Sequence, residues 1–175
     1  LGYCGAGVVE EIEGELPGVI VGDRVAFYGA PYIHHAEYVV APRHLLFSVP
    51  EGLASEEAAF IGIGAIALHG FRKANVGLGD VCLVQGGTGG VGHIAVQLAA
   101  NSGMYVITTA GSDASVESLH ELGADVVLDY KREDLADAIL EAAPGGVDVI
   151  LDYFPERYFD LDDLFGDRGR HRGGA

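Results

Sequence analysis

Positive charge is scarce in this chain of 175 residues, which has 10 Lys and Arg residues against 26 Asp and Glu and a formal net charge of −16. Proteins that bind nucleic acid use Lys and Arg to neutralise phosphates, so the composition argues against that class. It disfavours an anionic membrane surface for the same reason. The longest nearly apolar stretch, 58–71, is shorter than the ~20 residues of a membrane-spanning helix. We therefore expect a small-molecule substrate, with neither nucleic acid nor a membrane as partner.

Lysine is especially rare, because Lys73 and Lys131 are its only occurrences while eight positions hold arginine. An acidic surface with so little lysine repels itself in dilute buffer and is tolerated where salt screens the charges. This pattern favours a halophilic protein from a salt-rich cytosol. A GC-rich gene, which favours arginine codons without selection by salt, is the alternative.

Cysteine is also nearly absent, with Cys4 and Cys82 far apart in the sequence. Two such cysteines make neither a disulfide framework nor the spacing of a metal site. The chain has no signal-peptide pattern. Together these observations predict a protein of the reducing cytoplasm.

The first part of the chain shows short β-rich runs that Pro, Gly, His and Asp separate. This pattern is typical of an all-β region with tight turns. The runs are Val8–Ile12, Arg24–Tyr28, Glu37–Val40 and Leu45–Val49.

The pattern changes after Pro50-Glu51-Gly52, where Ser55 is placed to cap a helix that runs to about Asn75 with a possible break near Gly62 or Gly64. Strand and helix patterns then alternate, which predicts right-handed crossovers and a parallel sheet covered by helices. The expected strands are 80–85, 105–109, 126–129 and 148–152, and the expected helices are 91–102, 115–122 and 133–142.

Both ends of the chain are abrupt, because it opens at Leu1 rather than Met and shows no strand pattern after Tyr153. Four strands of a doubly wound sheet would leave an apolar edge unpaired. We therefore expect an incomplete α/β domain over 53–153, a partial β domain over 1–52 and an irregular tail over 154–175. A truncated or frameshifted reading would explain the ends.

A glycine-rich segment with the spacing Gly87-x-Gly89-x-x-Gly92 follows the strand expected at 80–85. In a dinucleotide fingerprint the first glycine makes a tight turn, the second admits the pyrophosphate and the third allows close packing of helix and strand. The helix N-terminus then offers free N–H groups to the phosphates. Its position between a strand and a helix predicts a pyrophosphate site; the candidates are Gly87, Gly89, Gly90, Val91 and Gly92.

The second strand of the α/β region ends at Ala110-Gly111-Ser112, without the Asp or Glu that usually holds the ribose hydroxyls of NAD. Asp113 is better explained as an acid at the start of the next helix. Absence of the carboxylate removes repulsion toward a ribose phosphate, which favours NADP. No Arg or Lys stands beside Ser112 in the sequence, which weakens this inference.

Several motifs in order resemble the medium-chain dehydrogenase/reductase superfamily, most closely its zinc-independent branch, the NADPH-dependent quinone oxidoreductases. The resemblance spans about Gly2 to Tyr153. It rests on Gly7-Val8-Val9, Gly22-Asp23-Arg24-Val25, Ala36-Glu37-Tyr38-Val39-Val40, Pro50-Glu51-Gly52, Glu56-Glu57-Ala58-Ala59, the Gly87–Gly92 loop, Leu122-Gly123-Ala124-Asp125 and Asp129-Tyr130.

The resemblance implies a GroES-like β domain followed by a Rossmann domain, with hydride transfer in the cleft between them. It also implies that zinc is absent, because the motif that reads Gly-His-Glu in zinc-dependent relatives is Gly2-Tyr3-Cys4 here. A further thiolate ligand of those relatives would fall near Ile61, which cannot bind a metal. Cys4 alone is better explained as a small buried residue.

The resemblance further implies that a Ser and a Lys after the second strand and a Tyr after the third hold the ribose phosphate. Ser112 and Tyr130 match this pattern, whereas Ser115 stands where the Lys is expected. Tyr130 has an alternative explanation as an ordinary aromatic residue at a strand end.

No residue is assigned as the catalytic acid. His69 is a candidate, although a hydrogen-bonded structural role explains it better. His34 and His35 are adjacent on an expected strand, face opposite sides and therefore do not share a metal. The alternatives to a quinone reductase are a zinc-type alcohol dehydrogenase, an enoyl reductase or a nucleotide-binding remnant without turnover. A homo-oligomer is possible for a full-length parent.

Overall fold

The protein is described by a computed structural model that covers residues 2–30 and 32–153. It divides into two compact units, one ending at Ala65 and the other beginning at Ile66. This division falls inside helix α2 (Ile61–Ala74). The assignment of domains to 1–52 and 53–153 stays a prediction, and the expected tail over 154–175 lies outside the described residues.

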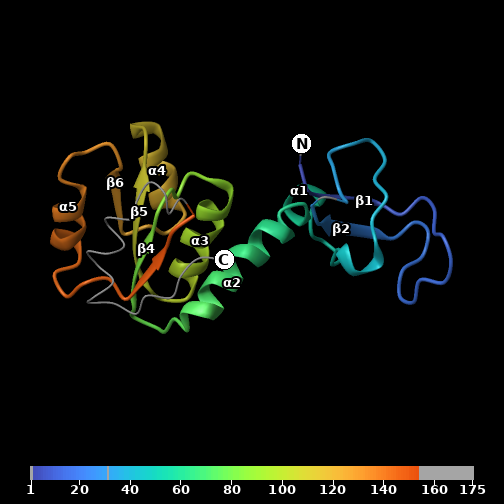
Figure 1. Ribbon diagram of the computed structural model, residues 1–175, viewed down its shortest axis with the longest axis horizontal. Helices are drawn as coiled ribbons and strands as arrows, with labels where there is room; N and C mark the ends of the chain where they lie inside the picture. Colours follow the sequence, from blue (N-terminus) through green and yellow to red (C-terminus); the bar gives the residue numbers. More distant parts are fainter. Residues whose placement is uncertain (1, 31, 154–175) are drawn as a thin grey trace. The chain divides into compact units, whose positions relative to one another are not determined.

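The first unit contains a small antiparallel sheet in the order β1-β2-β3 (Figure 1). Its strands are β1 (Cys4–Val8), β2 (Arg24–Tyr28) and β3 (Leu46–Ser48), and a 3₁₀ turn (Arg43–Leu45) precedes β3. The β2 strand lies at the expected position, and β3 lies within the expected run 45–49.

The strand expected at Val8–Ile12 is wrong, because β1 ends at Val8. Residues of low strand propensity dominate β1, but each faces a partner on β2. Gly5 lies opposite Phe27, and a Cβ at Gly5 would come within 2.7 Å of the Phe27 ring. Cross-strand packing therefore selects a segment that local propensity does not indicate.

The strand predicted at Glu37–Val40 is also wrong, since this segment is irregular and has a bend at Glu37 and Tyr38. Tyr38 and Val40 are 72% and 91% exposed, so their β-forming side chains bury little surface. Without burial, the propensity of these residues does not impose a strand.

The helix expected over 55–75 is two helices, α1 (Ser55–Ala58) and α2 (Ile61–Ala74). The expected break near Gly62 or Gly64 lies at residues 59 and 60, two residues before Gly62, and both glycines are themselves helical. Ser55 is the first helical residue rather than the cap, and its Oγ accepts a hydrogen bond from Arg24 at 3.2 Å. The residue before the helix, Ala54, donates its N–H to the carboxylate of Glu57 at 3.2 Å.

The second unit is the expected parallel sheet, in the order β6-β5-β4-β7. This order corresponds to the first four strands of the Rossmann arrangement, 3-2-1-4. Its elements are β4 (Val81–Val84), α3 (Gly90–Asn101), β5 (Tyr105–Ala110), α4 (Asp113–Glu121), β6 (Val126–Asp129), α5 (Leu135–Ala142) and β7 (Val149–Leu151). The predicted Rossmann-type α/β class is confirmed.

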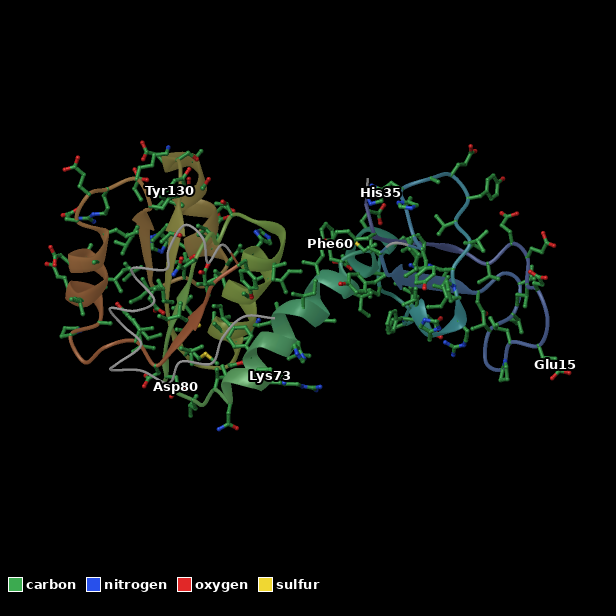
Figure 2. The ribbon with its side chains drawn as sticks, in the orientation of Figure 1. Glu15, His35, Phe60, Lys73, Asp80 and Tyr130 are labelled. Atoms are coloured by element: carbon green, nitrogen blue, oxygen red, sulfur yellow. The ribbon has the colours of Figure 1, made fainter. Side chains whose placement is uncertain are left out.

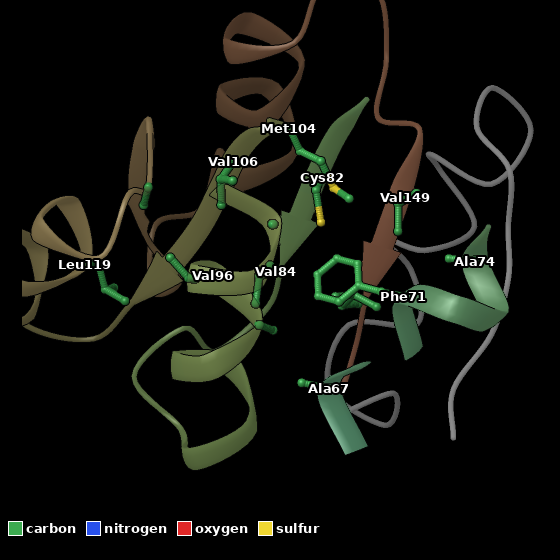
Figure 3. Close-up of a cluster of buried hydrophobic side chains, with 14 of the residues drawn as sticks. Ala67, Phe71, Ala74, Cys82, Val84, Val96, Met104, Val106, Leu119 and Val149 are labelled. Atoms are coloured by element: carbon green, nitrogen blue, oxygen red, sulfur yellow. The ribbon is translucent and has the colours of Figure 1, made fainter. Parts of the chain in front are cut away.

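Helices cover both faces of this sheet, and Figure 1 shows α3 and α5 on opposite sides of it. Alternate residues of a strand point to opposite faces. Cys82, Val84 and Val106 therefore join a cluster with the helices α2, α3 and α4, whereas Leu83 and Ile107 pack against α5. Figure 3 shows the first of these clusters, with Phe71 of α2 among the strand side chains.

None of the helices in the described part of the chain is both long and apolar enough to cross a membrane.

Candidate nucleotide-binding site

The glycine-rich loop joins the carboxyl end of β4 to the start of α3 at Gly90. Gly86 has a φ of +69°, which L-residues rarely adopt, so the tight turn is at Gly86 rather than at Gly87 as expected. The loop is closed by a hydrogen bond from the Gly89 N–H to the Gly86 carbonyl at 2.9 Å.

Strand β5 anchors the loop through two hydrogen bonds. The N–H of Gly86 donates to Thr109 Oγ1 at 2.9 Å, and the N–H of Gly87 donates to the Thr109 carbonyl at 3.1 Å. The neighbouring Thr108 is buried, and its hydroxyl donates to the Val84 carbonyl at 2.8 Å. The two threonines of β5 thus bond to the end of β4 and to the glycine loop that follows it.

Two glycines of the fingerprint allow close packing that larger residues would prevent. A Cβ at Gly87 would overlap the hydroxyl of Thr108, and a Cβ at Gly92 would overlap the Gly86 carbonyl oxygen. Gly92 therefore has the position expected of the third glycine, where the helix approaches the loop.

The first turn of α3 is the part of the loop region that is suited to an anion. Gly89 precedes the helix, and its carbonyl accepts the N–H of His93 at 2.8 Å. The N–H groups of the first turn, at Gly90, Val91 and Gly92, precede the point at which intrahelical hydrogen bonds begin. They form the donor set that a pyrophosphate requires, and the helix dipole favours a negative charge there.

The carboxyl ends of β5 and β6 lie side by side, with Ala110 paired to Asp129. Ser112 follows β5 and precedes α4, whose first turn contains Asp113, as expected. The hydroxyl of Ser112 lies 2.8 Å from that of Ser115, the residue found where the resemblance expects a lysine. The two phosphate-site candidates, Ser112 and Tyr130, thus lie near this end of the sheet. Figure 2 labels Tyr130 at this end and Asp80 at the opposite end.

Tyr130 packs directly on the backbone after β5. A Cβ at Gly111 would come within 2.6 Å of Tyr130 Cε1 and 3.1 Å of its hydroxyl. The N–H of Tyr130 donates to the Ala110 carbonyl at 3.1 Å. The structure therefore brings Tyr130 next to Gly111 and Ser112, although the two segments are separated by a whole helix in the sequence.

Sequence reasoning missed Lys131, because it examined only the residues near Ser112 along the chain. The Lys131 ammonium donates to the Gly111 carbonyl at 2.6 Å. It also lies 5.5 Å from the centroid of the Tyr130 ring. The signal that could have found it is the parallel pairing of β5 and β6, because the residues that follow two paired parallel strands lie at the same end of the sheet.

The positions related to zinc ligands lie in the first unit. Tyr3 packs edge to face on Tyr28, with 5.6 Å between ring centroids. The Cys4 carbonyl lies 3.2 Å from His35 Nε2. Over residues 2–30 and 32–153, no three His, Cys, Asp or Glu side chains gather closely enough to hold a metal ion.

The histidines singled out by the sequence lie on exposed positions. His34 and His35 belong to an irregular segment rather than a strand, so the expectation of a strand there is wrong. His69 lies on α2 and is also exposed.

Comparison with known proteins gives one family model, described as zinc-binding dehydrogenase, which matches residues 90–161. A polyketide synthase subunit of Mycobacterium tuberculosis, named for phenolphthiocerol and phthiocerol, is 39% identical over 86% of the chain but is matched over 7% of its own length. The quinone oxidoreductase of Pongo abelii is 32% identical over 84% of the chain and 46% of its own length. The chain thus spans less than half the length of these curated relatives.

Solved structures that resemble this chain belong to the same kinds of protein as these relatives. A quinone oxidoreductase from Pseudomonas syringae matches 99% of the chain and 53% of its own, with a TM-score of 0.82 and 28% identity. A mycobacterial protein solved as its complex with NADPH matches 91% of the chain and 51% of its own, with a TM-score of 0.81 and 34% identity. With the glycine loop between β4 and α3, these matches show that the chain belongs to the medium-chain dehydrogenase/reductase superfamily, in its quinone oxidoreductase-like branch.

Proposed function

We propose that this chain is the nucleotide-binding part of a zinc-independent oxidoreductase that uses NADPH to reduce a quinone or another conjugated carbonyl. The observation that carries the proposal is the glycine loop, which β5 anchors at the N-terminus of α3. Oxidoreductases related to the chain support the reaction class. When bound, the nicotinamide would supply the hydride, and the protein would supply binding and orientation.

The residues present fit a dinucleotide. Gly90, Val91 and Gly92 would hold the pyrophosphate by backbone N–H groups, and Gly87 and Gly89 would shape the loop around it, because their own N–H groups donate to the Thr109 and Gly86 carbonyls. Ser112 and Tyr130 would hold the ribose phosphate by their hydroxyls. The end of β5 carries no Asp or Glu to bind a ribose hydroxyl, because it runs Ala110-Gly111-Ser112.

The names of two relatives support a conjugated substrate. One is a 2-methylene-furan-3-one reductase of Solanum lycopersicum and the other a 2-haloacrylate reductase of a Burkholderia species. Both names describe an alkene next to a carbonyl or carboxylate group. A quinone has the same conjugation of C=C with C=O, so one hydride-accepting arrangement serves all three.

The remaining parts of the proposal concern the setting of the protein. We propose a small-molecule substrate and no nucleic acid as partner, because a net charge of −16 repels polyanions. We also propose a cytoplasmic location and a homo-oligomer in a longer parent protein.

The test is a calorimetric titration of the 175-residue chain with NADPH and, separately, NADH in molar KCl. We expect NADPH to bind at least about tenfold more tightly, which corresponds to about 1.4 kcal/mol. Equal affinity, or preference for NADH, would overturn the assignment of Ser112 and Tyr130. Binding of neither nucleotide would overturn the nucleotide-binding function of this chain.

Turnover separates the reaction from simple binding. Consumption of NADPH in the presence of a simple quinone, unchanged by a chelator, supports the metal-free reductase. Activity that disappears with a chelator would identify a zinc-type alcohol dehydrogenase instead. Tight NADPH binding with no turnover of any conjugated carbonyl would contradict the enzymatic part of the proposal.

A further inference from the structure

We propose that Lys131 supplies the positive charge for the ribose phosphate of NADPH, although it reaches the site from the segment after β6 rather than from the segment after β5. This inference rests on the proposed function and adds the residue that determines the choice between NADPH and NADH. It also explains how the site works with Ser115 in the position where the resemblance expects a lysine.

Four residues form one group at the carboxyl ends of β5 and β6, here called the strand-end cluster: Gly111, Ser112, Tyr130 and Lys131. The Lys131 ammonium is fixed by its 2.6 Å hydrogen bond to the Gly111 carbonyl. Gly111 directly precedes Ser112, so one peptide group separates the anchored ammonium from the serine. The cation therefore lies at the peptide group that leads into Ser112 and 5.5 Å from the centroid of the Tyr130 ring.

The Tyr130 ring sets the geometry of the cluster. It packs on Gly111, where a Cβ would lie 3.1 Å from the tyrosine hydroxyl. The Lys131 ammonium lies 5.5 Å from the ring centroid, within the range of a cation–π contact. The Gly111 carbonyl and the Tyr130 ring thus both contact the Lys131 ammonium.

The ammonium retains capacity for an anion. An ammonium has three N–H donors, and one of them is used on the Gly111 carbonyl. A phosphate that accepts another of them gains a charge-assisted hydrogen bond, which is stronger than a neutral one.

Neighbouring cations are less suited to this role. Arg132 is held by Asp134 through two hydrogen bonds of 2.6 and 2.8 Å. Lys73, the only other lysine, is on α2, and Figure 2 shows it far from Tyr130. Lys131 is therefore the basic residue that the described structure places against Gly111.

Carboxylates near the cluster make this cation important. Asp113 lies in the first turn of α4. The carboxylate of Asp129 accepts a hydrogen bond from the backbone N–H of Lys131 at 2.9 Å. Without a local positive charge, these groups would repel a phosphate dianion. The lysine offsets this repulsion where the helix N-terminus and the two hydroxyls provide hydrogen bonds.

The test compares Lys131→Gln with Lys73→Gln, which removes the same charge from an exposed position on α2. Each variant of the 175-residue chain is titrated with NADPH and NADH, and with adenosine 2′,5′-bisphosphate and AMP. For Lys131→Gln we expect about tenfold weaker binding of the two ligands that carry a 2′-phosphate, and less than about twofold change for NADH and AMP. Lys73→Gln should bind all four ligands like the parent chain, and Lys131→Arg should keep the NADPH preference.

The outcomes distinguish this inference from the proposed function. If the parent chain prefers NADPH and Lys131→Gln keeps the same preference, the role of Lys131 is wrong and the proposed function stands. If Lys131→Gln weakens NADPH and NADH equally, the lysine supports only the fold of the loop, and the inference is overturned. If the parent chain has no NADPH preference, the proposed function fails and the inference with it.

Discussion

Gly92 shows how a single residue fixes the approach of a helix to a glycine-rich loop. Its hypothetical Cβ would overlap the Gly86 carbonyl oxygen and lie 2.9 Å from the Gly86 carbonyl carbon and 3.1 Å from Gly87 Cα. All of these are backbone atoms, which cannot move aside as the end of a flexible side chain can. Gly92→Ala should therefore lower the free energy of unfolding by about 1–3 kcal/mol and weaken nucleotide binding.

The matched control is Gly64→Ala, inside helix α2, where a Cβ would find no atom within 4 Å. Because alanine is favoured over glycine within a helix, this variant should gain about 0.5–1 kcal/mol. Urea unfolding of both variants measures the two changes. Equal stability changes would show that the close contact at Gly92 relaxes without cost.

The two cysteines differ in reactivity for a physical reason. Burial, with a smaller contribution from the charge of Asp80, raises the pKa of Cys82 to about 12. Cys4 is partly buried, and burial raises its pKa too, but its side chain is not fully enclosed. In the folded protein at pH 8, we expect a thiol reagent to modify Cys4 and not Cys82, whereas both should react in denaturant.

Cys82 also links stability to alkaline pH. Its pKa rises from an ordinary value of 9.0 in the unfolded chain to about 12 in the folded protein. Folding therefore favours the neutral thiol; this contribution is complete below pH 9 and is lost as the pH rises toward 12. Urea midpoints measured over this range should fall less steeply for Cys82→Ala, and identical slopes would contradict the assignment.

At the scale of elements, β5 connects the glycine loop to the sheet through two adjacent threonines. Thr109→Val removes the acceptor of the Gly86 N–H, which then lacks this partner at a partly buried position. We expect a loss of about 1–3 kcal/mol of stability and weaker NADPH binding. Thr108→Val removes a buried hydroxyl that donates to the Val84 carbonyl, and about 1 kcal/mol should be lost without a direct effect on the loop.

The control for this pair is Thr109→Ser, which keeps the hydroxyl group. It should bind NADPH nearly as the parent chain does. Chemical unfolding and calorimetric titration of the three variants test the assignment. If Thr109→Val binds as tightly as Thr108→Val, the side-chain hydrogen bond does not organise the loop.

Elements of the parallel sheet are predictable from sequence because packing of apolar side chains on both faces of the sheet leaves a clear signal. Val126–Asp129 has the predicted bounds, and Gly123 before it marks the end of the preceding helix. The first unit is harder, since β1 depends on its partner β2 and the β-forming residues at 37–40 are exposed. The strand propensity of the residues themselves predicts neither the strand β1 nor the irregular segment at 37–40.

The candidate site likewise has one part that the sequence predicts and one part that it does not. The glycine spacing shows in the sequence because the loop and helix are contiguous. The position of Lys131 does not, because its contact with Gly111 joins residues twenty positions apart. Only the register of β5 against β6 brings them together.

For the whole molecule, we expect the net charge of −16 to dominate the response to salt. Repulsion between carboxylates destabilises the compact chain, and salt screens this repulsion. We expect the melting temperature to rise between low and molar KCl, measured by circular dichroism. A melting temperature that is constant or falls would contradict the halophilic interpretation and favour the codon explanation of the arginine bias.

The proposed arrangement of three loops around one nucleotide would have a consequence for the energetics of folding. The donors follow β4, β5 and β6, so they are adjacent only when these three strands are paired. A ligand that binds the paired state alone stabilises it by RT ln(1 + [L]/Kd), about 2.7 kcal/mol at a hundred times Kd. NADPH should therefore slow amide exchange throughout the parallel sheet, including residues that never touch it, and thereby act as a cohesive element of the domain.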